Sequence, residues 1–362
     1  MIVPTGGKME NRWLADVLAR PTPESVRFLG RTEVVDCLAR IDVVAAVKDA
    51  LVSHHHGRTI LPSEAYLSWT NQHGAYSRSI GMPGAVLDQG DEAAYGMKII
   101  NASVSNPEFG LERAGGLGLC FDPRTARVTA VMEVGVLSAV RTAAVTAIAV
   151  EATGYGSVRS LAVVGCGTQA RVHLALLLAR CPELRRITLC DVRRPVAESL
   201  AGELVSRHPG VSFSVAATPA EAMADAEMTL FLTTVSEGYV RPDWVRPGSL
   251  LLNVSLGDLT DEVLTGASAL VVDDVQLIVE NPRRPLGRLI NEGRIAAKAR
   301  ADRPSITATI GELLAGDMLS ERPDTGYVVV NPFGLGILDV ALFGAVLRRA
   351  SSAGIGQVLE LV

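Results

Sequence analysis

Residues 160–180 read SLAVVGCGTQARVHLALLLAR, an apolar run followed by a glycine-rich turn and an amphipathic segment. The turn has the spacing G-x-G-x-x-A, formed by Gly165, Gly167 and Ala170. In this pattern the first glycine permits a tight turn, the second lets a pyrophosphate approach the backbone, and the small third residue lets a helix pack closely. The stretch therefore predicts a strand, a turn and a helix whose N-terminus binds a dinucleotide.

The type of dinucleotide depends on the next apolar run. RRITLC is followed by Asp191, about twenty residues after the glycines, where an acidic side chain binds the ribose 2′-hydroxyl. A carboxylate there repels a 2′-phosphate and favours NAD, whereas Arg193 and Arg194 close by leave NADP as the alternative. A glycine turn in some other α/β protein is the alternative without a cofactor. Further candidate cofactor-binding residues are Thr168, Gln169, Thr233 and Thr234, the last two at the end of the fourth strand of this region.

Short apolar runs alternate with helical stretches from about 140 to 275, as in ITLCD, MTLFLTT and ALVVDD. This alternation predicts an α/β fold with a doubly wound parallel sheet of the Rossmann type. Shorter strands and turns fill 60–135, and a strand and a final helix follow 315, so both chain ends are expected to form a β-rich domain. The expected organisation is an N-terminal extension (1–25), a β-rich domain (26–140, completed by 315–362) and a dinucleotide-binding domain (141–314).

Composition narrows the class of partner. The chain has 362 residues, a net charge of −5, 48% hydrophobic residues and 20% charged residues. No basic face is evident, so nucleic acid and membrane surfaces are not expected partners, and a small-molecule substrate is. Without an apolar run long enough to span a membrane or a secretory start, we expect a cytoplasmic protein. The five cysteines form no CxxC pair and are expected to be reduced packing residues.

Two charged residues stand in apolar surroundings. Asp258 follows the run LLLNVSL, at the carboxyl end of a predicted strand, where ligands bind in such sheets. It is a candidate catalytic residue, although it could instead cap the following turn with Thr260. Lys98 is a lone charge in YGMKIIN, where it is either a buried functional group or a side chain that reaches solvent at a sheet edge.

Arg141 is the single basic residue in VLSAVRTAAVTAIAV. With Ser138 as the expected N-cap, Arg141 falls in the first helical turn, where the helix dipole disfavours a cation by a few tenths to about 1 kcal/mol. An anion should therefore accompany it, either Glu133 or a substrate carboxylate. Arg78 in SRSIGMP and Arg113 in LERAGG are further candidate substrate ligands, although each alone is more often a surface residue.

The motifs MEVGVLSAVRTAAVTAIA, VVGCGTQA, VSLGD and NPFGLGILD resemble the ornithine cyclodeaminase/mu-crystallin family of NAD(P)-dependent enzymes, from about residue 26 to the C-terminus. GMKIINASVSNPEFGLERAGGLGLCFDP and VVVNPFGLGILD most resemble the branch of N-(2-amino-2-carboxyethyl)-L-glutamate dehydrogenases. That branch uses NAD to form 2,3-diaminopropionate and 2-oxoglutarate for siderophores and peptide natural products. The resemblance leaves three alternatives: an ornithine cyclodeaminase, a ketimine or imino-acid reductase, and an idle NAD(P)-binding protein like the crystallins.

The resemblance also implies site residues and an assembly. It implies a homodimer whose β-rich domain binds substrate and mediates dimerisation. Lys98 and Arg141 match the family's carboxylate ligands, and Asp258 matches its active-site aspartate. Arg78 matches an arginine of the diaminopropionate branch, whereas Glu64 stands where the family often has a basic residue. The candidates are thus Asp258 and Lys98 for catalysis, and Arg78, Lys98, Arg113 and Arg141 for substrate binding.

Overall fold

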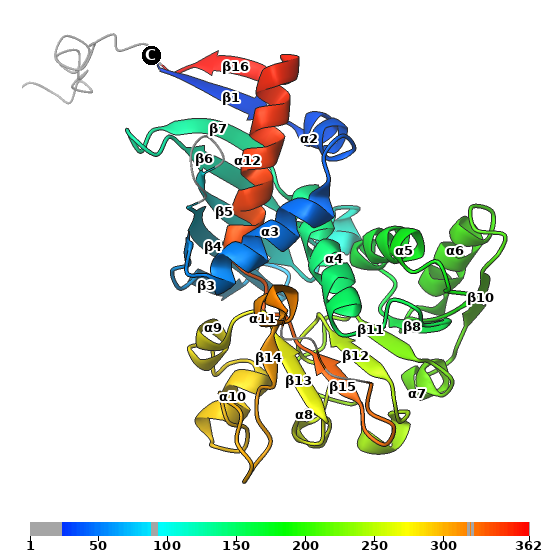
Figure 1. The fold of residues 1–362 in the computed structure, drawn as a ribbon. Helices are drawn as coiled ribbons and strands as arrows, with labels where there is room; N and C mark the ends of the chain where they lie inside the picture. The colour runs from blue at the N-terminus through cyan, green and yellow to red at the C-terminus, as the bar shows by residue number, and fades with distance from the viewer. Residues whose placement is uncertain (1–23, 88–92, 317–318, 320–321, 362) are drawn as a thin grey trace, which may run out of the picture.

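The computed structural model describes residues 24–87, 93–316, 319 and 322–361 (Figure 1). Most of the expected N-terminal extension lies outside these residues, and Ser25 already begins the first strand. The described chain forms two eight-stranded sheets, with helices packed between and around them.

A parallel sheet forms the second half of the molecule. Its strands are β8 (Ser160–Val164), β9 (Arg186–Cys190), β10 (Ser212–Val215), β11 (Met228–Phe231), β12 (Leu250–Asn253), β13 (Ala269–Val272), β14 (Ala308–Thr309) and β15 (Val328–Val330). They lie in the order β10-β9-β8-β11-β12-β15-β13-β14. The chain moves outward from β8 to β10 and then returns to the other side of β8. A topological switch point therefore lies between β8 and β11, and the predicted doubly wound fold is confirmed.

Helices connect these strands on both faces of the sheet (Figure 1). They are α5 (Thr168–Arg180), α6 (Arg194–Val205), α7 (Pro219–Met223), α8 (Asp261–Thr265), α9 (Val275–Val279), α10 (Pro285–Asn291) and α11 (Ile310–Ala315), with a 3₁₀ turn η3 (Pro242–Trp244). One strand departs from the expected organisation. β15 lies between β12 and β13, so the chain returns to the β-rich domain after this strand rather than at residue 315.

The other sheet is largely antiparallel and draws on both chain ends. Its strands are β1 (Ser25–Leu29), β2 (Thr59–Ile60), β3 (Ala65–Thr70), β4 (Tyr76–Val86), β5 (Ala94–Ser103), β6 (Ala114–Phe121), β7 (Val128–Glu133) and β16 (Gln357–Glu360). The order is β16-β1-β7-β6-β5-β4-β2, and β3 also pairs with β4. Associated helices are α2 (Arg31–Leu38), α3 (Val43–His55) and α12 (Gly336–Ala353), with a 3₁₀ turn η2 (Asn106–Phe109).

Helix α4 (Gly135–Ala152) lies between the two sheets (Figure 1). It is long and apolar enough to cross a membrane, but most of it is buried in the main core, as in the core helix of a soluble-type fold. The expected Ser138 cap is wrong. The carboxylate of Glu133 caps the helix instead, accepting from the backbone N–H groups of Gly135 (2.6 Å) and Val136 (3.2 Å). Arg141 therefore lies in the second helical turn, and Glu133 is not its partner.

Helix α12 crosses the antiparallel sheet above β4 to β6 (Figure 1). Its Phe343 is fully buried and lies directly over Gly118 of β6, where an ideal Cβ would come within 2.6 Å of the phenyl Cζ. Gly118 is paired with Lys98 on β5, and Asp339 lies one helical turn before Phe343. The close approach at Gly118 therefore sets where Asp339 meets the sheet.

Replacing Gly118 by Ala tests this docking. The added methyl would displace Phe343, so we expect the free energy of unfolding to fall by about 1–3 kcal/mol in urea titrations. Gly115→Ala on the same strand is the matched control, because its Cβ would meet nothing within 4 Å. Equal stabilities of the two variants would contradict this account of α12.

Candidate active site

Four predicted residues gather at the carboxyl edge of the parallel sheet. Gly165 follows β8, Asp191 follows β9, Thr233 follows β11 and Asp258 follows β12. Because these four strands are neighbours in the sheet, the residues after them lie along one edge, at the switch point. This edge is where open α/β sheets bind dinucleotides.

The glycine loop has the geometry that a pyrophosphate site requires. Gly165 has a φ of 94°, and a Cβ there would lie 2.6 Å from the carbonyl oxygen of Leu232. Gly167 is the N-cap of α5 and supplies no capping side chain, so the N–H groups of the first turn remain for phosphate oxygens. Exposed Thr168 begins the helix, and buried Ala170 faces the core. Gln169 Oε1 is buried without a hydrogen-bond partner among the described residues, which suits a site that a cofactor completes.

Asp191 holds the second strand to this loop. Its carboxylate accepts from the N–H of Cys166 (2.8 Å) and from the N–H of Arg193 (2.9 Å). Arg193 is exposed, and the Arg194 guanidinium pairs with Glu198 (2.8 Å) on α6. The carboxylate of Asp191 therefore lies next to the loop while Glu198 binds the Arg194 guanidinium, a set that fits NAD better than NADP.

Asp258 is fully buried at the same edge. Its Oδ1 accepts hydrogen bonds from Thr233 (2.7 Å) and from the Tyr239 hydroxyl (2.9 Å), and its Oδ2 accepts one from Ser255. The alternative turn with Thr260 is not formed among the described residues, because the Thr260 N–H donates to the carbonyl oxygen of Val240 (3.2 Å). Burial raises the pKa of Asp258, while these hydrogen bonds oppose the rise. A carboxylate whose pKa is raised is a stronger base, which suits a group that accepts a proton. Thr234, next to Thr233, is exposed.

Lys98 and Arg141 share one carboxylate that sequence reasoning missed. Lys98 Nζ lies 2.6 Å from Asp339 Oδ2, and the Arg141 guanidinium lies 3.2 Å from both oxygens of Asp339. All three side chains are buried, so Lys98 does not reach solvent. Burial is the largest influence on Lys98 and lowers its pKa to about 8; Asp339 opposes this effect and Arg141 adds to it. The triad carries one surplus positive charge when Lys98 is protonated, which suits an incoming anion.

A loop after β15 joins this triad to the parallel sheet. Asn331 Oδ1 accepts from the amide of Asn253 at the end of β12 (2.6 Å). The Asp273 carboxylate, after β13, accepts from the N–H groups of Phe333 (2.8 Å) and Gly334 (2.6 Å). Gly334 in turn lies against the Arg141 guanidinium. The loop thus brings the triad to the edge that carries the glycine loop and Asp258.

A second basic group lies farther along the antiparallel sheet. Arg78 on β4 and Arg113 before β6 are half-buried, and the charge of Arg78 acts on both Arg113 and Arg284. Burial, followed by this like charge, lowers the pKa of Arg113 and of Arg284. Glu64 faces the same space, and burial raises its pKa against the nearby charges of Lys98, Arg284, Arg141 and Arg78. Sequence reasoning missed Arg284, which stands in a polar Pro-Arg-Arg-Pro turn that gives no signal of burial.

Known proteins resemble this chain in both of its sheets and in the residues that connect them. The sequence profile of the ornithine cyclodeaminase/mu-crystallin family matches residues 26–354. The chain belongs to this family. The resemblance inferred from the sequence motifs is therefore confirmed.

Three family relatives resemble the chain over most of its length. An N-((2S)-2-amino-2-carboxyethyl)-L-glutamate dehydrogenase of Staphylococcus aureus is 28% identical over 320 residues, which cover 88% of this chain and 93% of that enzyme. The crystal structure of CmnK is 44% identical, with a TM-score of 0.86 over 94% of this chain and 99% of CmnK. An archaeal alanine dehydrogenase dimer with bound NAD is 25% identical, with a TM-score of 0.78 over 94% of this chain and 100% of that one.

Asp339→Asn tests the buried triad. Two buried cations would then lack a counter-ion, so we expect the free energy of unfolding to fall by about 3–5 kcal/mol. The loss relative to the parent protein should be greater at pH 6 than at pH 9, because Lys98 can release its proton at the higher pH. Adding Lys98→Met should recover part of the stability in urea titrations.

Asp243→Asn is the control, because Asp243 forms an exposed ion pair with Arg241. This substitution should lower the free energy of unfolding by less than about 1 kcal/mol. A triad variant as stable as this control, or a double variant no more stable than Asp339→Asn, would contradict the account.

Proposed function

We propose that this protein uses NAD to cleave N-(2-amino-2-carboxyethyl)-L-glutamate oxidatively, yielding L-2,3-diaminopropionate and 2-oxoglutarate. The observation that carries the proposal is the excess of basic side chains in one region. Lys98 and Arg141 share the single carboxylate of Asp339, while Arg78 and Arg113 form no ion pair with a carboxylate among the described residues. The substrate has three carboxylates, which matches this demand for anions.

The chain is an NAD-dependent enzyme of amino-acid metabolism that acts on a CH–NH bond, as its family and its dehydrogenase relatives indicate. NAD is the cofactor, in agreement with the acid at Asp191 and with the NAD bound in the archaeal alanine dehydrogenase. In the proposed division of labour, the parallel sheet holds NAD through Gly165, Gly167 and Asp191, and the antiparallel sheet holds the substrate.

Binding and orientation fall to the basic residues. Lys98 and Arg141 would hold the α-carboxylate of the glutamate portion, because their shared Asp339 leaves one positive charge uncompensated. Arg78 and Arg113 would hold a carboxylate farther from the reacting carbon. NAD, when bound, accepts hydride from the glutamate Cα. Fixing the α-carboxylate orients that carbon for the transfer.

Asp258 supplies the proton chemistry. An amine can lose hydride only when its nitrogen lone pair is free, so Asp258 would first accept the ammonium proton. Loss of hydride from Cα then leaves a carbon–nitrogen double bond. After passing this first proton to solvent, Asp258 would deprotonate the water that attacks the imine carbon and give that proton to the nitrogen. The carbinolamine then collapses, and its hydroxyl proton leaves with the departing amine. One water is consumed, the C–N bond breaks, and the products are 2-oxoglutarate and a free primary amine.

Exposed apolar side chains support the proposed homodimer. Leu67 and Trp69 on β3 and Leu117 on β6 are between 45% and 63% exposed on one face of the antiparallel sheet. Apolar groups of this size are commonly covered by a partner, and a second copy is the partner we propose. A cytoplasmic location and an interaction with a small amino-acid substrate, rather than nucleic acid or membrane, complete the proposal.

Product analysis tests the proposed reaction. Incubated with NAD, the purified protein should convert the amine to equal amounts of NADH, 2-oxoglutarate and 2,3-diaminopropionate, measured by absorbance and mass spectrometry. Ornithine should give no proline. Ammonia and proline from ornithine without net NADH would indicate a cyclodeaminase, reduction of cyclic imino acids would indicate a reductase, and tight NAD binding without turnover would indicate an idle protein.

Asp258→Asn tests the role of this carboxylate. Loss of a general base typically reduces kcat by about 10²–10⁴-fold, and we expect a loss in this range. NADH affinity, measured by fluorescence titration, should stay within a few-fold of the parent value. Asp243→Asn is the surface control and should keep full activity. An unchanged kcat in the Asp258 variant would remove Asp258 from the mechanism.

A further inference from the structure

We propose that Arg284 is a specificity-determining residue, which joins Arg78 and Arg113 in a second anion site for a carboxylate remote from the reacting carbon. This inference rests on the proposed function, because it assumes a substrate with several carboxylates. It adds a residue from the dinucleotide-binding half of the chain to a substrate site otherwise built on the antiparallel sheet.

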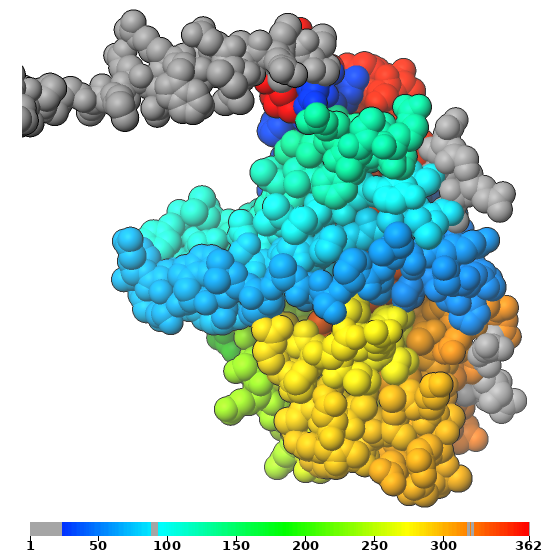
Figure 2. Space-filling model, turned by 90° about the vertical axis from the view of Figure 1, so that its left-hand side faces the viewer, coloured from blue at the N-terminus to red at the C-terminus, as the bar shows by residue number. Residues whose placement is uncertain are grey.

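Contacts between the two halves bring Arg284 to this place. Ser63 donates to Glu280 (2.8 Å), and the Arg283 guanidinium lies over the ring of Tyr66, 4.1 Å from its centroid. Figure 2 shows the yellow residues of this segment packed directly beneath the blue residues of the antiparallel sheet. Tyr66 on β3 in turn hydrogen bonds with the hydroxyl of Tyr76 on β4. Arg78 lies two residues farther along β4, on the same face as Tyr76.

The three guanidinium groups lack the counter-ion that Lys98 and Arg141 possess. Within the described residues, none of Arg78, Arg113 and Arg284 forms an ion pair with a carboxylate within 4 Å. The charge of Arg78 acts on Arg113 and Arg284, and both of these arginines are substantially shielded from solvent. Glu64 is near Arg78 and Arg284 but pairs with neither. Like charges held together in this way are costly unless an anion joins them.

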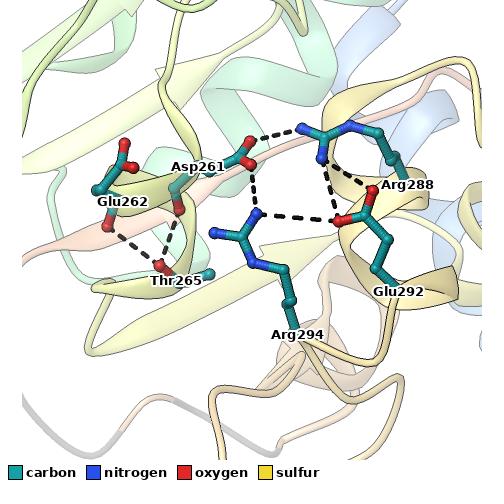
Figure 3. A network of polar contacts seen from close by, with 6 residues as sticks. All are labelled: Asp261, Glu262, Thr265, Arg288, Glu292 and Arg294. Carbon is teal, nitrogen blue, oxygen red and sulfur yellow. Dashed lines mark hydrogen bonds and ion pairs between the residues drawn. The ribbon is translucent and has the colours of Figure 1, made fainter.

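Helix α10 is fixed so that Arg284, its N-cap residue, cannot easily move away. Asp261 at the start of α8 binds two arginines, Arg288 of α10 (2.6 Å) and Arg294 beyond it (2.5 Å), as Figure 3 shows. Arg288 also pairs with Glu292 (3.1 Å). Asp261, the first residue of α8, is three residues after Asp258 in the chain. The network therefore fixes Arg284 relative to the catalytic carboxylate, a condition for selecting substrates by length and charge.

A carboxylate is the ligand that this geometry fits. Guanidinium groups bind carboxylates through paired hydrogen bonds, and three of them can hold one or both of the carboxylates that Lys98 and Arg141 leave free. These are the side-chain carboxylate of the glutamate portion and the carboxylate of the aminopropionate portion. Both offer the same chemistry, so amide analogues of each distinguish them.

The experiment compares three amines: the tricarboxylate and its two analogues, each with one of these carboxylates converted to an amide. For the parent enzyme we expect kcat/KM to be about 10–100-fold lower for the analogue that lacks the bound carboxylate. Arg284→Gln should lower kcat/KM for the tricarboxylate by a similar factor, mainly through KM, and should abolish the preference. Arg284→Lys should keep part of it. Arg207→Gln, which removes an exposed arginine that pairs with Glu203, is the matched control.

Binding separates this inference from the proposed reaction. Calorimetric titration of the tricarboxylate into each NADH complex should show the same loss of affinity in Arg284→Gln as the kinetics. Lack of turnover by the parent enzyme would refute the proposed reaction alone. Unchanged affinity in Arg284→Gln, or an equal loss for all three amines, would refute the role of Arg284. Parent-like thermal unfolding and NADH affinity exclude a folding defect in the variant.

Discussion

The buried carboxylate of Asp339 is the interaction on which the site depends. Two buried cations without it would be costly, and with it Lys98 and Arg141 form a triad with one surplus positive charge. Two contacts place Asp339: Phe343 seats α12 on Gly118, and the loop after β15 ties the helix start to the ends of β12 and β13. Packing on one sheet and hydrogen bonds to the other thus converge on a single carboxylate.

The two sheets create opposite electrostatic environments at their junction. On the antiparallel side, burial lowers the pKa of Lys98 to about 8, yet basic side chains still outnumber acidic ones. On the parallel side, burial raises the pKa of Asp258, which three hydroxyl donors hold in place. Shifted pKa values of opposite direction are typical of sites that bind an anion at one point and move a proton at another. Oxidation of an amino-acid derivative requires both, because its carboxylate must be bound and its amine must lose a proton.

Local signals in the sequence predicted much of this arrangement. The glycine spacing and Asp191 predicted a dinucleotide site. Lys98, Arg141 and Asp258 were predicted to be functional because each is a charged residue among apolar neighbours. Asp339 was not predicted as a site residue, because its partner Lys98 lies 241 residues away in the sequence and local spacing gives no information about such a contact. Ser138 misled because Glu133, one position before the N-cap, competes for the same N–H groups. The position of Arg284 near Arg78 and the position of β15 in the parallel sheet likewise depend on tertiary packing, which local sequence does not reveal.

A crystal structure with NADH and N-(2-amino-2-carboxyethyl)-L-glutamate would test the central claim most directly, because NADH cannot accept hydride and the amine would remain intact. We expect one carboxylate on Lys98 and Arg141, with Asp339 still between them, and a second carboxylate on Arg78, Arg113 and Arg284. The secondary amine should lie within hydrogen-bonding distance of Asp258. A substrate whose carboxylates avoid Lys98 and Arg141, or whose amine lies far from Asp258, would contradict the account.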